Sequence, residues 1–168
     1  MDQGINLAGI PLPSREPWFL LTVGVHVLAG IVAVVAGAIA MLSPKGPGRH
    51  PRAGSVYFWA LVTVSVTMAG LALARWPADN HLLALGVLAF GSAIVGRAAR
   101  RGTWQRWVYI HVTLMGLSYI LMMTAFYVDN GPNLPLWNRL PQLAFWLLPS
   151  LVGLPLIAHA LQRRLQPR

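Results

Sequence analysis

The sequence predicts an all-α membrane protein, a polytopic bundle of five transmembrane helices. Of the 168 residues, 56% are hydrophobic and only 10% are charged, whereas a soluble domain usually carries about 25% charged residues. The apolar residues are also grouped into five runs, most of them near the roughly 20 residues that cross a hydrocarbon core of about 30 Å. We therefore expect one transmembrane domain at residues 18–162, between an extracytoplasmic segment, 1–17, and a basic cytoplasmic tail, 163–168.

The first two spans flank a short basic loop. The first is expected at residues 18–42, which contain no charged side chain, and the second at residues 55–74. The loop between them holds Lys45, Arg49 and Arg52. Its glycines and prolines make a helix improbable between Pro44 and Pro51.

The remaining spans differ in composition. The third, at residues 81–95, is short and rich in glycine and alanine, and the fourth is expected at residues 105–128. The fifth, at residues 140–161, contains Pro141, Pro149 and Pro155. Because an interior proline removes a backbone hydrogen bond, we expect this helix to be kinked.

Lysine and arginine alternate between the loops and so predict the orientation. Three lie in the loop after the first span, four in residues 97–106 and three in the tail, whereas the other three segments hold one each. Because cytoplasmic loops carry the excess of basic residues, we expect the N-terminus outside and the C-terminus inside. The net charge of +9 then reflects topology and contact with anionic headgroups at the cytoplasmic face, not nucleic-acid binding.

The chemistry inside the expected spans rests on histidine. All four acidic residues lie in loops, and there is no cysteine, so thiolate metal sites and covalent c-type haem are excluded. His26 and His111 each begin a stripe of small or soft residues at helical spacing, which lets a helix or a flat ligand approach closely. We expect both histidines to face the bundle interior. The stripes are His26, Gly30, Ala33 and Gly37, and His111, Met115, Ser118 and Met122.

These residues resemble a bacterial family of predicted membrane proteins, domain of unknown function 2306 (DUF2306). The resemblance rests on the loop Lys45-Gly46-x-x-x-His50-x-x-x-Gly54-x-x-Tyr57. An intramembrane histidine precedes that loop in the family, as His26 does here, and a later histidine precedes a Ser-Tyr pair, matched by His111, Ser118 and Tyr119. Residues 124–141 resemble the family's later loop, while Pro51 stands where the family has arginine, with Arg52 beside it. The resemblance implies a multi-pass protein of the bacterial cytoplasmic (inner) membrane, but no reaction.

One functional hypothesis is a b-type haem that serves membrane electron transfer. His26 and His111 would be its main ligands, with His50 as a nearby ligand or propionate contact and Tyr119 adjoining. Lys45, Arg49 and Arg52 would meet the propionates through charge-assisted hydrogen bonds. At 1.5 Å per residue the two main histidines differ in depth by roughly 9 Å, so a shared haem requires tilt, a kink or two separate sites.

Two other hypotheses use the same histidines. A His-only site for Zn²⁺ or Cu²⁺ would draw on His26, His50, His111 and His159. Alternatively, the histidines only hydrogen-bond between helices in a non-catalytic partner or assembly subunit, within a homo-oligomer or a larger membrane complex. We expect no hydrolase or phosphotransferase activity, because no activated nucleophile, carboxylate pair or phosphate loop is present.

Overall fold

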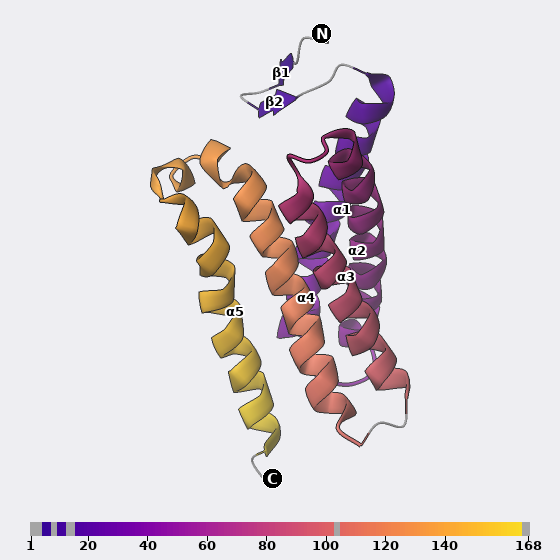
Figure 1. Cartoon of the computed structure of the whole chain (residues 1–168). Helices are drawn as coiled ribbons and strands as arrows, with labels where there is room; N and C mark the ends of the chain where they lie inside the picture. The colour runs from indigo at the N-terminus through magenta and orange to yellow at the C-terminus, as the bar shows by residue number, and fades with distance from the viewer. Residues whose placement is uncertain (1–4, 8–9, 13–15, 103–104, 166–168) are drawn as a thin grey trace. The chain divides into compact units, whose positions relative to one another are not determined.

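The computed structural model describes residues 5–7, 10–12, 16–102 and 105–165, and its described part is dominated by five α-helices (Figure 1). Two short strands, β1 (Ile5–Leu7) and β2 (Ile10–Leu12), pair antiparallel before the first helix; this hairpin was not expected from the sequence. The last part of the expected tail, residues 166–168, lies outside the described residues. The helices are α1 (Pro17–Leu42), α2 (Arg49–Ala74), α3 (Asn80–Arg101), α4 (Trp107–Asn130) and α5 (Gln142–Leu165).

All five helices are long and apolar enough to cross a membrane, which confirms the predicted helical class. Their apolar segments span 22 to 27 residues, against the roughly 20 that a bilayer core requires. Many large apolar side chains are exposed along them, including Leu21 at 70% and Val66 at 67%. A bundle that presents such side chains outward is suited to lipid and not to water.

The start of α2 differs from the prediction, because it lies at Arg49 and not at residue 55. The expectation of no helix between Pro44 and Pro51 is confirmed for residues 44–48 and wrong for residues 49–51. Pro51 is the third residue of the helix, where a backbone N–H has no intrahelical acceptor, so its missing donor costs nothing. Gly48 precedes the helix with φ 108°, a conformation that only glycine adopts readily. His50 therefore lies in the first turn of α2 and not in a loop.

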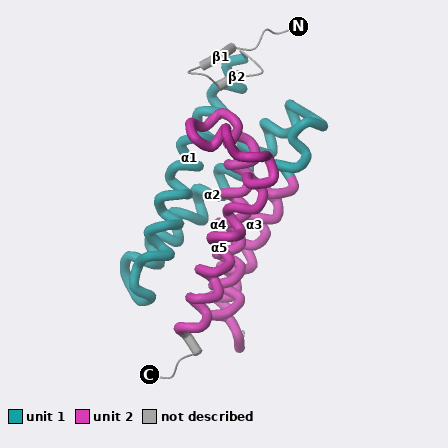
Figure 2. The backbone as a smooth tube through the Cα atoms, turned by 90° about the vertical axis from the view of Figure 1, so that its left-hand side faces the viewer, with its two compact units in different colours: residues 1–83 teal, residues 84–168 magenta. Residues whose placement is uncertain are grey.

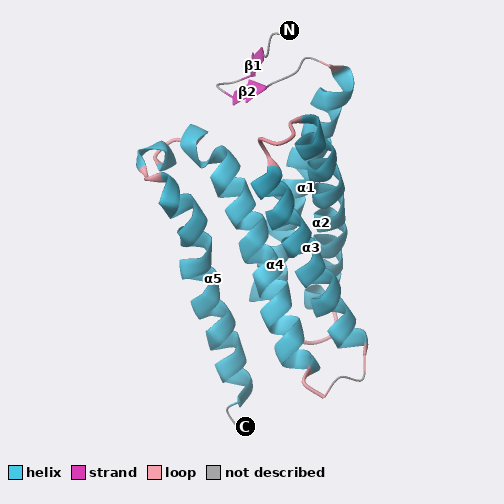
Figure 3. Ribbon diagram, viewed as in Figure 1, coloured by secondary structure: helices cyan, strands magenta, loops and turns pink. Residues whose placement is uncertain are grey.

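The later helices are displaced or longer than expected (Figure 3). α3 continues six residues beyond the expected end to Arg101, because arginine is a good helix former and favours a helix C-terminus. α5 begins after Pro141 and is assigned as one helix through Pro149 and Pro155, so the expected kink stays a prediction. Between α4 and α5 lie two short 3₁₀ helices, Gly131–Asn133 and Trp137–Arg139.

The chain divides into two compact units, residues 1–83 and residues 84–168 (Figure 2). In unit 1, α1 packs along α2, and apart from Phe19 near its start the buried positions of α1 are small: Ala33, Ala36, Gly37 and Ala40. In unit 2, α4 packs along α5. Here a Cβ on Gly116 would come within 2.6 Å of Ile157, and Gly153 meets Ile120 in the same way. Small residues thus let the paired backbones approach closely in both units.

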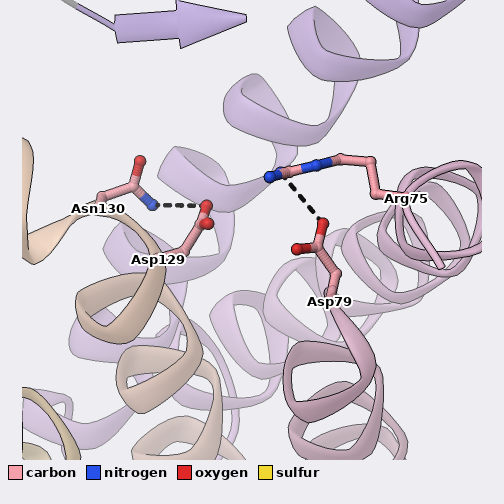
Figure 4. Close-up of polar contacts among 4 residues, drawn as sticks. All are labelled: Arg75, Asp79, Asp129 and Asn130. Atoms are coloured by element: carbon pink, nitrogen blue, oxygen red, sulfur yellow. Dashed lines mark hydrogen bonds and ion pairs between the residues drawn. The ribbon is translucent and has the colours of Figure 1, made fainter. Parts of the chain in front are cut away.

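Polar side chains near the helix ends pair locally (Figure 4). Arg75 Nη1 lies 3.1 Å from Asp79 Oδ2 across the turn between α2 and α3, which compensates the charge of an aspartate that is only 8% exposed. At the end of α4, the side-chain amide of Asn130 donates to Asp129 at 3.3 Å.

Candidate functional site

The C-terminal end of α1 is completed by side chains of the basic loop. Pro44 forces Ser43 into an extended conformation (φ −74°, ψ 147°), because the residue before a proline avoids the helical region. Lys45 Nζ then donates to the carbonyls of Ala40 at 2.9 Å and Met41 at 2.7 Å. His50 Nδ1 lies 2.8 Å from the same Ala40 carbonyl. These contacts satisfy acceptors that a helix C-terminus otherwise leaves open.

Replacing Lys45 with methionine should lower the free energy of unfolding by about 1.5–3 kcal/mol, the usual worth of hydrogen bonds to a charged group. Methionine keeps the length of the side chain but cannot donate to the Ala40 and Met41 carbonyls. Thermal unfolding of the detergent-purified protein measures the effect, with Lys45→Arg as the matched control that keeps the charge and the donors. Equal stability of the methionine and arginine variants would contradict the capping role.

His26 is bound to the neighbouring helix within unit 1. Its Nδ1 lies 2.9 Å from Thr67 Oγ1 of α2, and the Thr67 hydroxyl lies 2.7 Å from the carbonyl of Thr63. A hydroxyl has one hydrogen to donate, and the contact with a carbonyl uses it. Thr67 therefore accepts the hydrogen bond from His26 Nδ1–H. This agrees with the expectation that His26 faces another helix.

His111 makes the corresponding contact in unit 2. Its Nδ1 lies 2.8 Å from the carbonyl oxygen of Gly96 on α3. Gly96 is buried, and a Cβ there would meet Leu114 and Met115 of α4 at 3.2 Å. Farther along the predicted stripe, Ser118 is fully buried and Met122 is 8% exposed. The stripe that begins at His111 is therefore an interior face, as predicted.

The three histidines share one protonation pattern. A carbonyl oxygen can only accept, so Nδ1 of His50 and His111 carries the proton, as it does in His26. In the neutral imidazole the lone pair then lies on Nε2. A histidine that binds a metal through one ring nitrogen commonly donates the other N–H to a backbone carbonyl, which fixes the tautomer and the orientation of the ring. The described contacts orient all three rings in this way.

Within unit 1, His26 and His50 are too far apart to bind one iron. His50 contacts Ala40, which lies 14 residues along α1 from His26, or about 21 Å at 1.5 Å per residue. A haem bound by His26 would therefore lie about four helical turns from Lys45, Arg49 and the rest of the basic loop. Lys45 is also already bonded to the end of α1.

Within unit 2, His111 and His159 lie at similar depth. The contacts of Gly116 with Ile157 and of Gly153 with Ile120 show that α4 and α5 run antiparallel. Measured along the helix axis from the contact between Gly116 and Ile157, His111 lies about 7.5 Å toward the start of α4. His159 lies about 3 Å from the same contact toward the end of α5. Because the helices are antiparallel, both displacements point in the same direction. His159 is exposed, whereas His111 and Tyr119 are partly buried.

The shared ligation of a haem by His26 and His111 stays a prediction, because the two residues belong to different units. Among the described residues, no three histidine or acidic side chains form a group that could hold a metal ion. The contact of Thr67 was not predicted, although three hydroxyl residues in an otherwise apolar span, Thr63, Ser65 and Thr67, were a usable signal.

Comparison of the chain with protein-family models, curated proteins and solved structures finds no match. The resemblance to domain of unknown function 2306 therefore remains a prediction that rests on the residues quoted for it. The class of protein is defined by the helices alone: the described residues contain five helices that are long and apolar enough to cross a membrane.

Proposed function

We propose that this is a multi-pass protein of the bacterial cytoplasmic membrane that binds b-type haem through intramembrane histidines and serves membrane electron transfer. The observation that supports the proposal is the shared protonation pattern, because His26 and His111 each donate Nδ1–H to a partner on another helix. That arrangement places the lone pair of a neutral imidazole on Nε2, the nitrogen that would bind the iron.

The face of α1 beside His26 has room for a planar ligand of this kind. Beside His26, a Cβ on Gly30 would meet nothing within 4 Å, so the backbone of α1 leaves space on that face. When bound, haem supplies one-electron chemistry. The iron would be bound through Nε2 of His26 in unit 1 or of His111 in unit 2, with Thr67 orienting the first ring and the Gly96 carbonyl the second. A haem at His26 would lie about four helical turns from the basic loop, so the loop would not contact the propionates of a haem bound there.

A second candidate, a non-catalytic partner or assembly subunit, is favoured by a different observation. Lys45 and His50 complete the end of α1, so at least one of the three histidines has a structural task. In that case His26 and His111 also stabilise helix packing, and the purified protein carries no pigment. Elemental analysis of the same preparation separates this candidate from a zinc or copper protein, whose metal would be found in stoichiometric amount.

The orientation of the chain gives a direct prediction. A reporter fused after Arg168 should read as cytoplasmic, and one fused before Met1 as extracytoplasmic, because three basic segments alternate with three nearly neutral ones. A pair of reporters active inside and outside the cell, such as a fluorescent protein and alkaline phosphatase, measures both ends. A C-terminal fusion that reads as external would contradict the orientation.

A further inference from the structure

The outer surface of unit 1 carries an apolar groove between α1 and α2. Its volume is about 350 Å³, and its lining is five α1 residues between Ile31 and Ile39 together with Ala53 and Val56 of α2. Every lining side chain is apolar, and several are well exposed, among them Ile31 at 57% and Val35 at 52%.

The groove continues into a cationic surface at the start of α2. Arg49 lies four residues before Ala53, and Arg52 lies four residues before Val56, so each arginine shares a helical face with a lining residue. Both arginines are exposed. From Ile39, near this end, the groove extends eight residues along α1 to Ile31, or about 12 Å into the membrane.

An apolar groove with two arginines at one end favours one occupant among those that an apolar groove could hold. A neutral lipid would fill the groove without using the arginines. A second copy of the chain packed symmetrically across this surface would bring its Arg49 and Arg52 close to Arg49 and Arg52 of the first copy. Repulsion between these like charges makes that arrangement unfavourable. An anionic phospholipid satisfies both parts, since its acyl chain is apolar and its phosphate accepts bidentate hydrogen bonds from arginine.

We propose that the α1–α2 groove is a binding site for one anionic phospholipid, with an acyl chain along Val35 and Ile39 and the phosphate at Arg49 and Arg52. The groove begins at Ile31, five residues along α1 from His26, and its headgroup end lies at the start of α2. The proposal uses neither His26 nor His111, so it goes beyond the proposed haem function and does not depend on it. The basic loop then has two tasks: Lys45 and His50 complete α1, and the two arginines hold a lipid headgroup.

The test counts the phospholipid retained by the full-length chain in detergent, using native mass spectrometry. The protein is offered phosphatidylglycerol and phosphatidylcholine with identical dioleoyl chains. We expect one phosphatidylglycerol per chain with at least a tenfold preference, as two basic residues near an anionic headgroup predict. Arg49→Gln combined with Arg52→Gln should remove most of that preference.

Filling the groove tests the apolar half of the site. Val35→Trp should lower retention of the lipid about tenfold or more, whereas Val27→Trp should leave it unchanged. The two valines are matched, since both lie on α1 with exposures of 52% and 51%, but only Val35 lines the groove. The double glutamine variant changes only exposed side chains, so it keeps the proposal testable even if Val35→Trp fails to fold.

Three results would overturn the proposal. Retention of phosphatidylglycerol by the double glutamine variant at the wild-type level would remove the headgroup site. An equal effect of Val27→Trp and Val35→Trp would indicate a general change in the surface. A change in oligomeric mass with Val35→Trp, or a loss of thermal stability without any change in retained lipid, would assign the groove to a second copy or to other helices of the same chain.

Discussion

Replacing His111 with alanine is expected to remove the haem from the purified protein, and replacing His26 should do the same if both bind one iron. Each substitution deletes the Nε2 ligand together with the Nδ1 hydrogen bond to Gly96 or Thr67. The pigment content per chain, measured by absorption, should fall to near zero. His81→Ala is the control, because His81 is exposed at the start of α3, and this variant should keep the pigment.

Replacing Thr67, which orients the His26 ring, should weaken haem binding without abolishing it. Thr67→Val removes the acceptor of His26 but keeps the ring itself, and loss of such a partner typically weakens metal affinity by 10–100-fold. The variant should therefore bind haem more weakly, as titration of the apoprotein would measure. If His26→Ala and His111→Ala keep full pigment and lose only thermal stability, both histidines are structural. Loss of pigment in one variant alone would indicate a single axial ligand, or a partner other than the second histidine.

A methyl group added at Gly116 should destabilise unit 2 by about 1–3 kcal/mol, the usual cost of overpacking a close contact. A Cβ there would lie 2.6 Å from Cγ1 and Cδ1 of Ile157 on α5, well inside van der Waals separation. Ile157 is β-branched and has few alternative rotamers within a helix. The backbones of α4 and α5 would have to move apart, and thermal unfolding of Gly116→Ala should show the loss.

The matched control is Gly91→Ala on α3. A Cβ at Gly91 would meet nothing within 4 Å, so only the helix propensity changes, and alanine should stabilise the protein by up to about 1 kcal/mol. Combining Gly116→Ala with Ile157→Ala should recover much of the loss, because the shortened side chain leaves room for the new methyl group. Stabilisation by Gly116→Ala alone would show that α4 and α5 do not pack at this position.

The five helices could be predicted because each rests on a long apolar run, and length and hydropathy are properties of the sequence alone. Their ends were harder to predict. The start of α2 was placed six residues late because proline was taken as a helix breaker, although Pro51 lies at a position where a helix tolerates it. α3 was cut short at Val95 because the arginines after it were assigned to a loop, whereas they continue the helix.

The candidate site was predicted in part. The spacing of small residues indicated that His26 and His111 face other helices, and both contact a neighbouring helix. Their partners could not be predicted, because the Gly96 carbonyl belongs to the backbone and any residue supplies one. The task of Lys45 was also missed. The sequence shows a basic loop, but only the path of the chain after Pro44 brings the ammonium group to the carbonyls of Ala40 and Met41.

The proposed function is tested most directly by the absorption spectrum of the full-length protein, purified in detergent from cells supplied with haem precursor. The proposal predicts a Soret band that shifts on reduction with dithionite, at about one haem per chain by pyridine haemochrome assay. A protein that is folded by circular dichroism, shows no Soret band and binds no added haem would contradict it.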